Sequence, residues 1–135
     1  MTYAQLLARY RRKHGKLIEP RQGFVSLHED LWLAYSMGRV RGFTDLGTYV
    51  DKPGDHGFIP SWAFDLGRED RFLSKGWGYL KARRLAKLYV REHKALNIEN
   101  VILGRRLWSR EKPYWHPLRT GDTSHDFHIH VSGHH

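Results

Sequence analysis

The chain has 135 residues, a length that fits one domain with one main core and leaves little room for a second. Lysine and arginine number 23 against 14 aspartates and glutamates, and the resulting net charge of +9 favours an anionic partner. No cysteine is present, which excludes disulfide scaffolds, thiol nucleophiles and cysteine-type zinc sites, so any metal must bind histidine, aspartate or glutamate.

The first third of the chain is predicted to be helical. Tyr3 to Arg12 carries apolar residues at helical spacing beside basic ones. Ser26 and Glu29 have the spacing of a capping box, and the apolar stripe after them predicts a second helix that ends near Gly38. The following segment, 42–57, is rich in glycine, aspartate and proline, which predicts an irregular loop.

The rest of the chain predicts short strands around one long helix. Trp62 to Leu66 alternates as a half-buried strand does. Lys75 to Leu96 is the longest helix candidate, and its apolar stripe is expected to pack on a sheet. That stripe comprises Ala82, Leu85, Ala86, Tyr89 and Leu96. Segments 101–103 and 107–108 are strand candidates, and 113–123 is predicted to be a loop. Together these elements predict an α+β fold.

The last predicted strand, 124–132, is the most informative segment. Its period of two places Phe127, Ile129 and Val131 on one side and Asp126, His128, His130 and Ser132 on the other. Two parallel imidazoles suit metal ligation, or one ligand beside one proton-transfer group. The alternative is a surface patch or part of a terminal histidine tract, because the chain ends in two histidines. The alternation with core-type residues favours the functional interpretation.

Further candidate ligands lie upstream. His56 belongs to the glycine- and proline-rich loop, and Asp65 lies in the strand that follows it, so a loop-to-strand turn could bring both to one ion. Each alone is weak, since a histidine in a turn is commonly a surface residue and an aspartate after a strand is commonly a helix cap. The order His, Asp, His-x-His makes the set more specific.

Segments 56–65 and 125–132 together resemble the zinc peptidases of the LAS group, which have the Hedgehog/DD-peptidase fold and cleave bacterial cell-wall peptides. Those enzymes carry a His-x-x-Gly-x-Ala-x-Asp segment and a closing strand of the Asp-His-Val-His-Val-Ser kind. The counterparts here are HGFIPSWAFD and HDFHIHVS. Segments 97–103 and 106–108 are similar to a strand and an "Ile-Trp" segment of actinobacterial and phage members. The resemblance spans 47–132 and implies a small antiparallel sheet flanked by helices.

The resemblance also implies the roles of individual residues. His56, Asp65 and His130 would bind Zn²⁺ and leave one position for water. Members with a glutamate base carry it three residues before the last ligand, where this chain has Phe127, so His128 would move the proton instead. Eight residues separate His56 from Asp65 where six are usual, which leaves Asp55 as an alternative neighbour of the metal.

Supporting roles follow from the same resemblance. Lys52 would stabilise the oxyanion, with Arg39 or Arg41 as alternatives, although Lys52 fits a solvated loop charge equally well. His125 would complete a His-x-x-His-x-His set, and Asp126 would hold an imidazole tautomer. Both could equally be residues at the start of a strand.

The resemblance thus implies a zinc-dependent peptidase of the D-Ala-D-Ala carboxypeptidase or murein endopeptidase type, similar to a bacteriophage endolysin. We expect one domain, 1–135, with a helical part at 1–40 and a metal-site core at 42–132. Peptidoglycan stem peptides would be the substrate, and anionic wall polymers possible partners of the positive charge.

The expected localisation follows from the start of the chain, which is basic rather than apolar. We expect synthesis in the cytoplasm without a signal peptide, and delivery to the wall by a holin or a virion. The alternatives are a basic nucleic-acid-binding protein or metal-dependent nuclease, and a non-catalytic wall binder. The lack of a nucleic-acid motif favours the peptidase.

Overall fold

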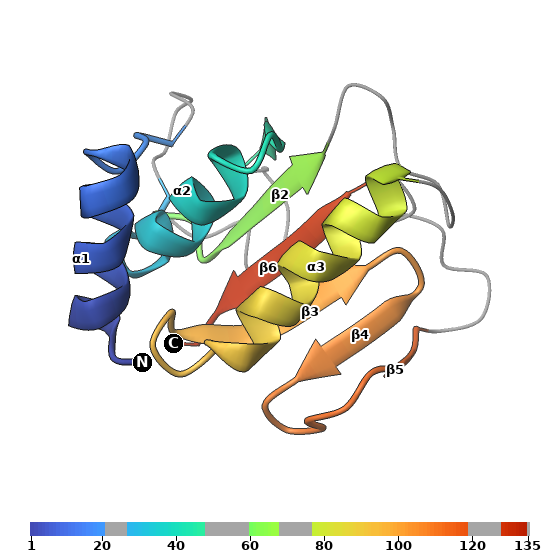
Figure 1. Ribbon diagram of the computed structural model, residues 1–135. Coiled ribbons are helices and arrows are strands. Elements are labelled where there is room, and N and C mark those ends of the chain that lie inside the picture. The colour runs from blue at the N-terminus through green and yellow to red at the C-terminus, as the bar shows by residue number, and fades with distance from the viewer. Residues whose placement is uncertain (21–26, 48–59, 68–76, 119–127, 135) are drawn as a thin grey trace.

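The computed structural model describes residues 1–20, 27–47, 60–67, 77–118 and 128–134. Within these ranges the chain forms three α-helices, one 3-10 turn and a six-stranded antiparallel sheet, which confirms the predicted α+β class. Helices α2 and α3 cover one face of the sheet, and α1 packs beside α2 (Figure 1). The N-terminal amine lies 3.5 Å from the Glu92 carboxylate, in the turn that follows α3.

The sheet brings distant parts of the chain side by side. Its strands are β1 (Thr44–Gly47), β2 (Ala63–Gly67), β3 (Ile98–Leu103), β4 (Arg106–Ser109), β5 (His116–Pro117) and β6 (Ile129–Gly133). Their order in space is β1-β2-β6-β3-β4-β5. The last strand therefore pairs with β2 on one side and β3 on the other, so the predicted metal-binding segment lies in the middle of the sheet.

Helix α1 (Tyr3–His14) matches its prediction and runs two residues further. The Thr2 hydroxyl accepts a hydrogen bond from the Gln5 backbone N–H, and the Gln5 side chain accepts one from the Thr2 N–H, which together form a capping box. Leu6 and Tyr10 are buried. The helix ends at Gly15, whose φ of 83° lies in the left-handed region that glycine adopts easily. The basic residues of this helix are exposed.

The second predicted helix exists but begins differently. A 3-10 turn, η1 (Glu29–Leu31), leads into α2 (Trp32–Arg39). Nδ1 of His28 accepts a hydrogen bond from the Asp30 backbone N–H at 3.2 Å and caps η1. Ser26, the predicted cap, lies outside the described residues. An imidazole can replace a hydroxyl here because its unprotonated nitrogen is also an acceptor.

Gly38 is the point where α2 meets both the sheet and α3. A Cβ atom at this position would lie 2.2 Å from the Leu66 Cδ1 and 2.7 Å from the Tyr89 hydroxyl oxygen. Only glycine lets the three elements approach this closely. The Tyr89 hydroxyl donates a hydrogen bond to the Ala34 carbonyl at 2.6 Å, which ties α3 to α2, and burial raises the pKa of Tyr89.

Helix α3 (Trp77–Arg91) packs on the sheet through the predicted stripe, whose five members are each at most 1% exposed. The Tyr89 ring meets the Phe64 ring of β2 edge-on, with centroids 6.2 Å apart. The helix ends five residues before its predicted end. A turn over 92–97 then carries Leu96 into the same core, so the apolar period continues although the helix does not.

Two loop predictions were wrong in part. Within 42–57, the segment Thr44–Gly47 is strand β1, which pairs with β2, while 48–57 lies outside the described residues. Within 113–123, His116–Pro117 forms β5, a two-residue edge strand beside β4. Proline is tolerated there because an edge strand needs only half of its backbone hydrogen bonds.

Candidate functional site

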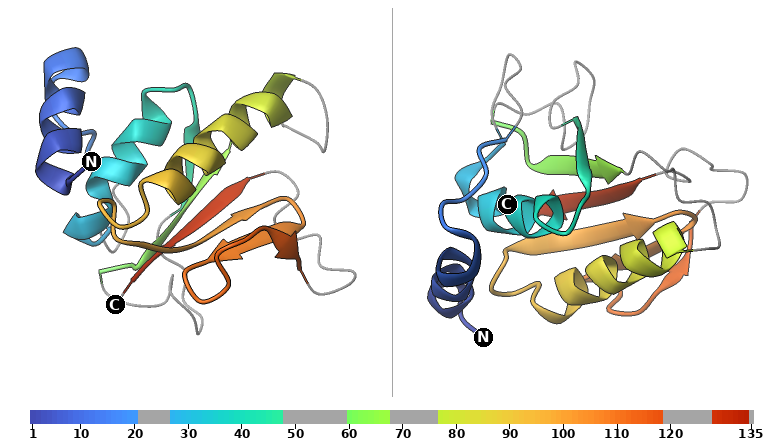
Figure 2. Two further views of the ribbon diagram at one scale, coloured as in Figure 1. Left: turned by 60° about the horizontal axis from the view of Figure 1, so that its bottom comes forward. Right: turned by 45° about the horizontal axis from the view of Figure 1, so that its top comes forward.

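Strand alternation divides the residues of β2 and β6 between two faces. Phe64 of β2 and Val131 of β6 are cross-strand partners, fully buried under the helices. Asp65 and His130 are the next pair in the ladder, so their side chains point to the opposite face. We call that surface, which carries Asp65, His130, Ser132, Asn100 and Ile102, the site face of the sheet. Figure 2 shows the sheet from two further directions.

Asp65 contacts both imidazoles of the His-x-His pair. Its Oδ1 atom lies 3.0 Å from Nδ1 of His130 and 3.6 Å from Nε2 of His128. Residue 128 immediately precedes β6, so both rings come from one end of the same strand. The exposed fraction of the side chain is 23% for Asp65, 18% for His128 and 13% for His130. The structure therefore brings together the three predicted site residues that it describes.

The separation between Asp65 and His130 can be compared with that of two ligands of one cation. With zinc–donor distances of about 2.0–2.1 Å, two ligands of a tetrahedral site lie about 3.3 Å apart. The Asp65 oxygen and Nδ1 of His130, the two predicted ligands that are described, lie 3.0 Å apart, about 0.3 Å below that value. Within the described ranges, however, no group of three or more histidine, aspartate or glutamate side chains is arranged so that it could hold a metal ion. The third predicted ligand, His56, belongs to the part of the chain that is not described.

Ser132 holds the other nitrogen of the His130 ring. The Ser132 hydroxyl oxygen lies 2.7 Å from Nε2 of His130 and is almost completely buried. A hydroxyl both donates and accepts, so it fits either tautomer. When Nδ1–H donates to Asp65, Ser132 donates to Nε2; when Nδ1 binds a cation, Nε2–H donates to Ser132. The ring is thus oriented by a partner on its far side, as metal-binding histidines usually are.

Exposure of the β2 and β6 side chains on the site face changes along the strands. Ala63 and Ser132 are a cross-strand pair, 0% and 1% exposed, so the sheet is covered there. Two residues along each strand, Asp65 and His130 are partly exposed, and His128 lies further towards that end. Along β2 and β6 the site face is therefore more accessible at the end where His128 lies.

Four predicted site residues lie outside the described ranges, as does the alternative ligand Asp55. These four are Lys52, His56, His125 and Asp126. The alternative oxyanion partners are described, and both lie on the helix side. Arg39 donates a hydrogen bond to the Tyr35 hydroxyl at 2.7 Å, and Arg41 donates to the Met37 carbonyl at 2.8 Å. Tyr35 packs edge-on against Phe64 on the buried face, so Arg39 is turned away from Asp65.

Sequence reasoning missed two polar residues of the site face. Ser132 stood on the predicted polar side of its strand, so alternation already indicated its position. Asn100 of β3 pairs with Ser132, and its Oδ1 atom is buried with no hydrogen-bond partner among the described residues. Only the strand pairing reveals this neighbour. Trp62, which precedes β2, is partly exposed and stacks on His28 with ring centroids 3.8 Å apart.

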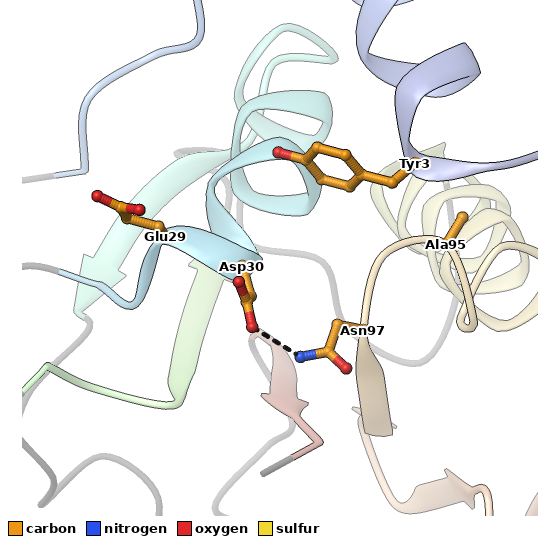
Figure 3. Close-up of a pocket in the computed structure, with 5 residues that line it drawn as sticks. All are labelled: Tyr3, Glu29, Asp30, Ala95 and Asn97. Atoms are coloured by element: carbon orange, nitrogen blue, oxygen red, sulfur yellow. Dashed lines mark hydrogen bonds between the residues drawn. The ribbon is translucent and has the colours of Figure 1, made fainter.

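A pocket elsewhere in the molecule does not include these residues. It lies between α1, η1 and the turn after α3, where it is lined by Tyr3, Glu29, Asp30, Ala95 and Asn97 (Figure 3). The Asn97 amide donates hydrogen bonds to the Asp30 carboxylate at 3.2 Å and to the His134 carbonyl at 3.1 Å. Asn97 thus links η1 to the residue that follows β6.

The described helices include none with the length and apolar character needed to cross a bilayer. Comparisons with protein-family models, with curated proteins and with solved structures found no match to this chain.

Proposed function

We propose that the chain is a zinc-dependent peptidase that hydrolyses peptide bonds of bacterial peptidoglycan. The observation that supports this best is the position of the Asp65 Oδ1 atom, 3.0 and 3.6 Å from two imidazoles on a partly open sheet face. A carboxylate oxygen and an imidazole nitrogen are both donors that zinc accepts. The family resemblance of the sequence supplies the reaction and the substrate class.

Each described residue has a distinct role in this proposal. Asp65 and Nδ1 of His130 would hold the zinc together with His56, and Ser132 would keep the His130 ring in place. When bound, zinc would acidify water and polarise the carbonyl oxygen of the scissile bond. His128 would move the proton, a role supported by the 3.6 Å between its Nε2 and Asp65 Oδ1 and by its 18% side-chain exposure. It would take the proton of the attacking water and return it to the leaving amine.

The test is to incubate the purified protein with peptidoglycan, with and without a chelator, and to identify the released fragments by mass spectrometry. Release of peptides or D-alanine should stop on chelation and resume when zinc is restored. Unchanged peptidoglycan together with cleavage of added DNA would instead support a metal-dependent nuclease. Adsorption to the wall without release would support a non-catalytic wall binder.

Two variants separate ligation from proton transfer. His130→Ala should lose both zinc and activity, whereas His128→Ala should keep zinc and lose about 10²- to 10⁴-fold in kcat, the usual contribution of a general acid–base group. His116→Ala is the matched control, because this half-buried histidine lies on β5 and contacts the Tyr114 carbonyl. Full zinc content in the His130 variant would contradict the ligand assignment.

A further inference from the structure

The outer face of α3 and of the turn that follows it is strongly cationic. The helix Trp77–Arg91 contains no acidic residue, and its buried stripe faces the sheet. Six basic side chains lie exposed on the opposite side: Lys81, Arg83, Arg84, Lys87, Arg91 and Lys94. We call these six residues the α3 cationic face. From residue 81 to residue 91 the helix rises about 15 Å, so the charges are dense.

Among the described residues, acidic side chains neutralise little of this positive charge. In the described part of the chain, the ion pairs include only one of the six, a 3.5 Å contact between Nε of Arg91 and the Glu92 carboxylate. The Arg91 side chain is still 71% exposed, and Glu92 is shared with the N-terminal amine. Six cations held close together repel one another, which costs stability unless an anionic partner is present. The surface therefore suits a polyanion.

The α3 cationic face lies across the sheet from the candidate site. Tyr89 on the inner side of α3 meets Phe64, and Phe64 points to the opposite face from its neighbour Asp65. Figure 1 shows α3 lying over β6 and β3 on the helix side. These cations therefore cannot contact a peptide at Asp65 and His130. They form a second, separate surface.

We infer that the α3 cationic face binds a phosphate-bearing polymer of the bacterial wall and keeps the protein next to its substrate. This inference rests on the proposed function for the identity of the polyanion. Arginine and lysine both bind phosphate groups, the former with two parallel hydrogen bonds. Single-stranded nucleic acid is less suited, because binding it requires exposed aromatic rings on which bases stack. Among the α3 side chains that the structure describes, the exposed large apolar one is the aliphatic Leu80, while the aromatic Tyr79 is partly buried.

The test compares two variants with equal loss of charge. In the first, Lys81, Arg83, Arg84 and Lys87 are changed to glutamine, which keeps helix propensity. In the control, Arg9, Arg11, Arg12 and Lys13 of α1, all exposed, are changed in the same way. Binding to immobilised poly(glycerol phosphate) is measured at several salt concentrations. Thermal unfolding of each variant shows that it is folded.

The α3 variant should lose at least about tenfold in affinity, and the slope of log K against log salt should fall, because fewer counterions are released. The α1 variant should stay within about threefold of the parent protein. Equal losses in both variants would overturn the inference, because net charge alone would then explain binding. Tighter α3-dependent binding to a DNA oligonucleotide than to the polymer would overturn it in favour of nucleic acid.

A parallel assay separates this inference from the proposed function. Cleavage of a soluble peptidoglycan fragment without polymer should be unchanged in the α3 variant, because the site lies on the other face. If the parent protein cleaves nothing but still loses polymer binding in the α3 variant, the peptidase proposal fails while the binding surface stands. If the parent protein cleaves the soluble fragment and the α3 variant binds the polymer normally, the peptidase proposal stands while the binding surface fails.

Discussion

Oδ1 of Asp65 is the atom around which the candidate site is arranged. It contacts two imidazoles, and one of them, His130, comes from 65 residues further along the chain. Both rings are partly buried, so the surrounding packing restricts the directions in which their nitrogen atoms point more than an open surface would. The far side of His130 is fixed by Ser132, whose hydroxyl is 2.7 Å from Nε2. Orientation by such a partner decides how strongly a histidine binds metal.

Ser132→Ala should therefore weaken zinc binding without removing a ligand. We expect the zinc dissociation constant to rise about 10- to 100-fold, the usual effect of losing the partner of a ligating histidine. Competition with a chelator of known affinity measures this value. The matched control is Ser109→Ala, since Ser109 lies two strands away on β4 and accepts a hydrogen bond from the Lys112 backbone. Equal zinc affinity in both variants would show that Ser132 does not orient the ring.

At the scale of elements, alternation and helical period were the reliable signals. They placed β2, β6 and the inner stripe of α3, because burial on one side imposes a period on the residue types. The same signal failed for β1, whose residues include aspartate and glycine, both rare in strands. β1 forms because its partner β2 offers a free edge and because Asp45 binds Tyr35. Such long-range pairing leaves no local pattern.

The Tyr35–Asp45 contact joins α2 to β1 and should make stability depend on alkaline pH. The hydroxyl of Tyr35 donates to the Asp45 carboxylate at 2.8 Å. Burial, reinforced by the Asp45 hydrogen bond and charge, raises the pKa of Tyr35 to about 12, although Arg39 opposes the shift. The unfolded chain loses this proton near pH 10. Between pH 10 and 12 the folded state holds more protons than the unfolded state, so stability must fall as pH rises.

Tyr35→Phe should flatten this decline, measured as the free energy of unfolding in urea at pH 8, 10 and 11. At pH 8 the variant should be less stable by about 1 kcal/mol, the usual net value of one hydrogen bond. Part of the decline should persist, because burial also raises the pKa of Tyr89. Tyr114→Phe serves as the control, since Tyr114 is 59% exposed. The same slope in the parent protein and Tyr35→Phe would contradict the assignment.

At the scale of the whole molecule, the sheet separates two surfaces of different character. One side carries the helices and the cationic charge of α3, and the other carries Asp65 and the histidines. The sequence predicted Asp65 and the histidines as one set but not its relation to the helices, because that depends on the insertion of β6 between β2 and β3. Sequence analysis also could not show that Asn100 lies beside Ser132, since strand order is not encoded in local periodicity.

Zinc binding should stabilise the entire fold, because Asp65 and His130 belong to adjacent central strands from distant parts of the chain. A ligand that binds only the folded state adds about 2.7 kcal/mol at a free concentration 100 times its Kd. Calorimetry should therefore show a higher Tm with zinc than with a chelator. His130→Ala should abolish the difference, while His116→Ala should preserve it. A Tm that is insensitive to zinc in the parent protein would mean that these strands do not share a cation.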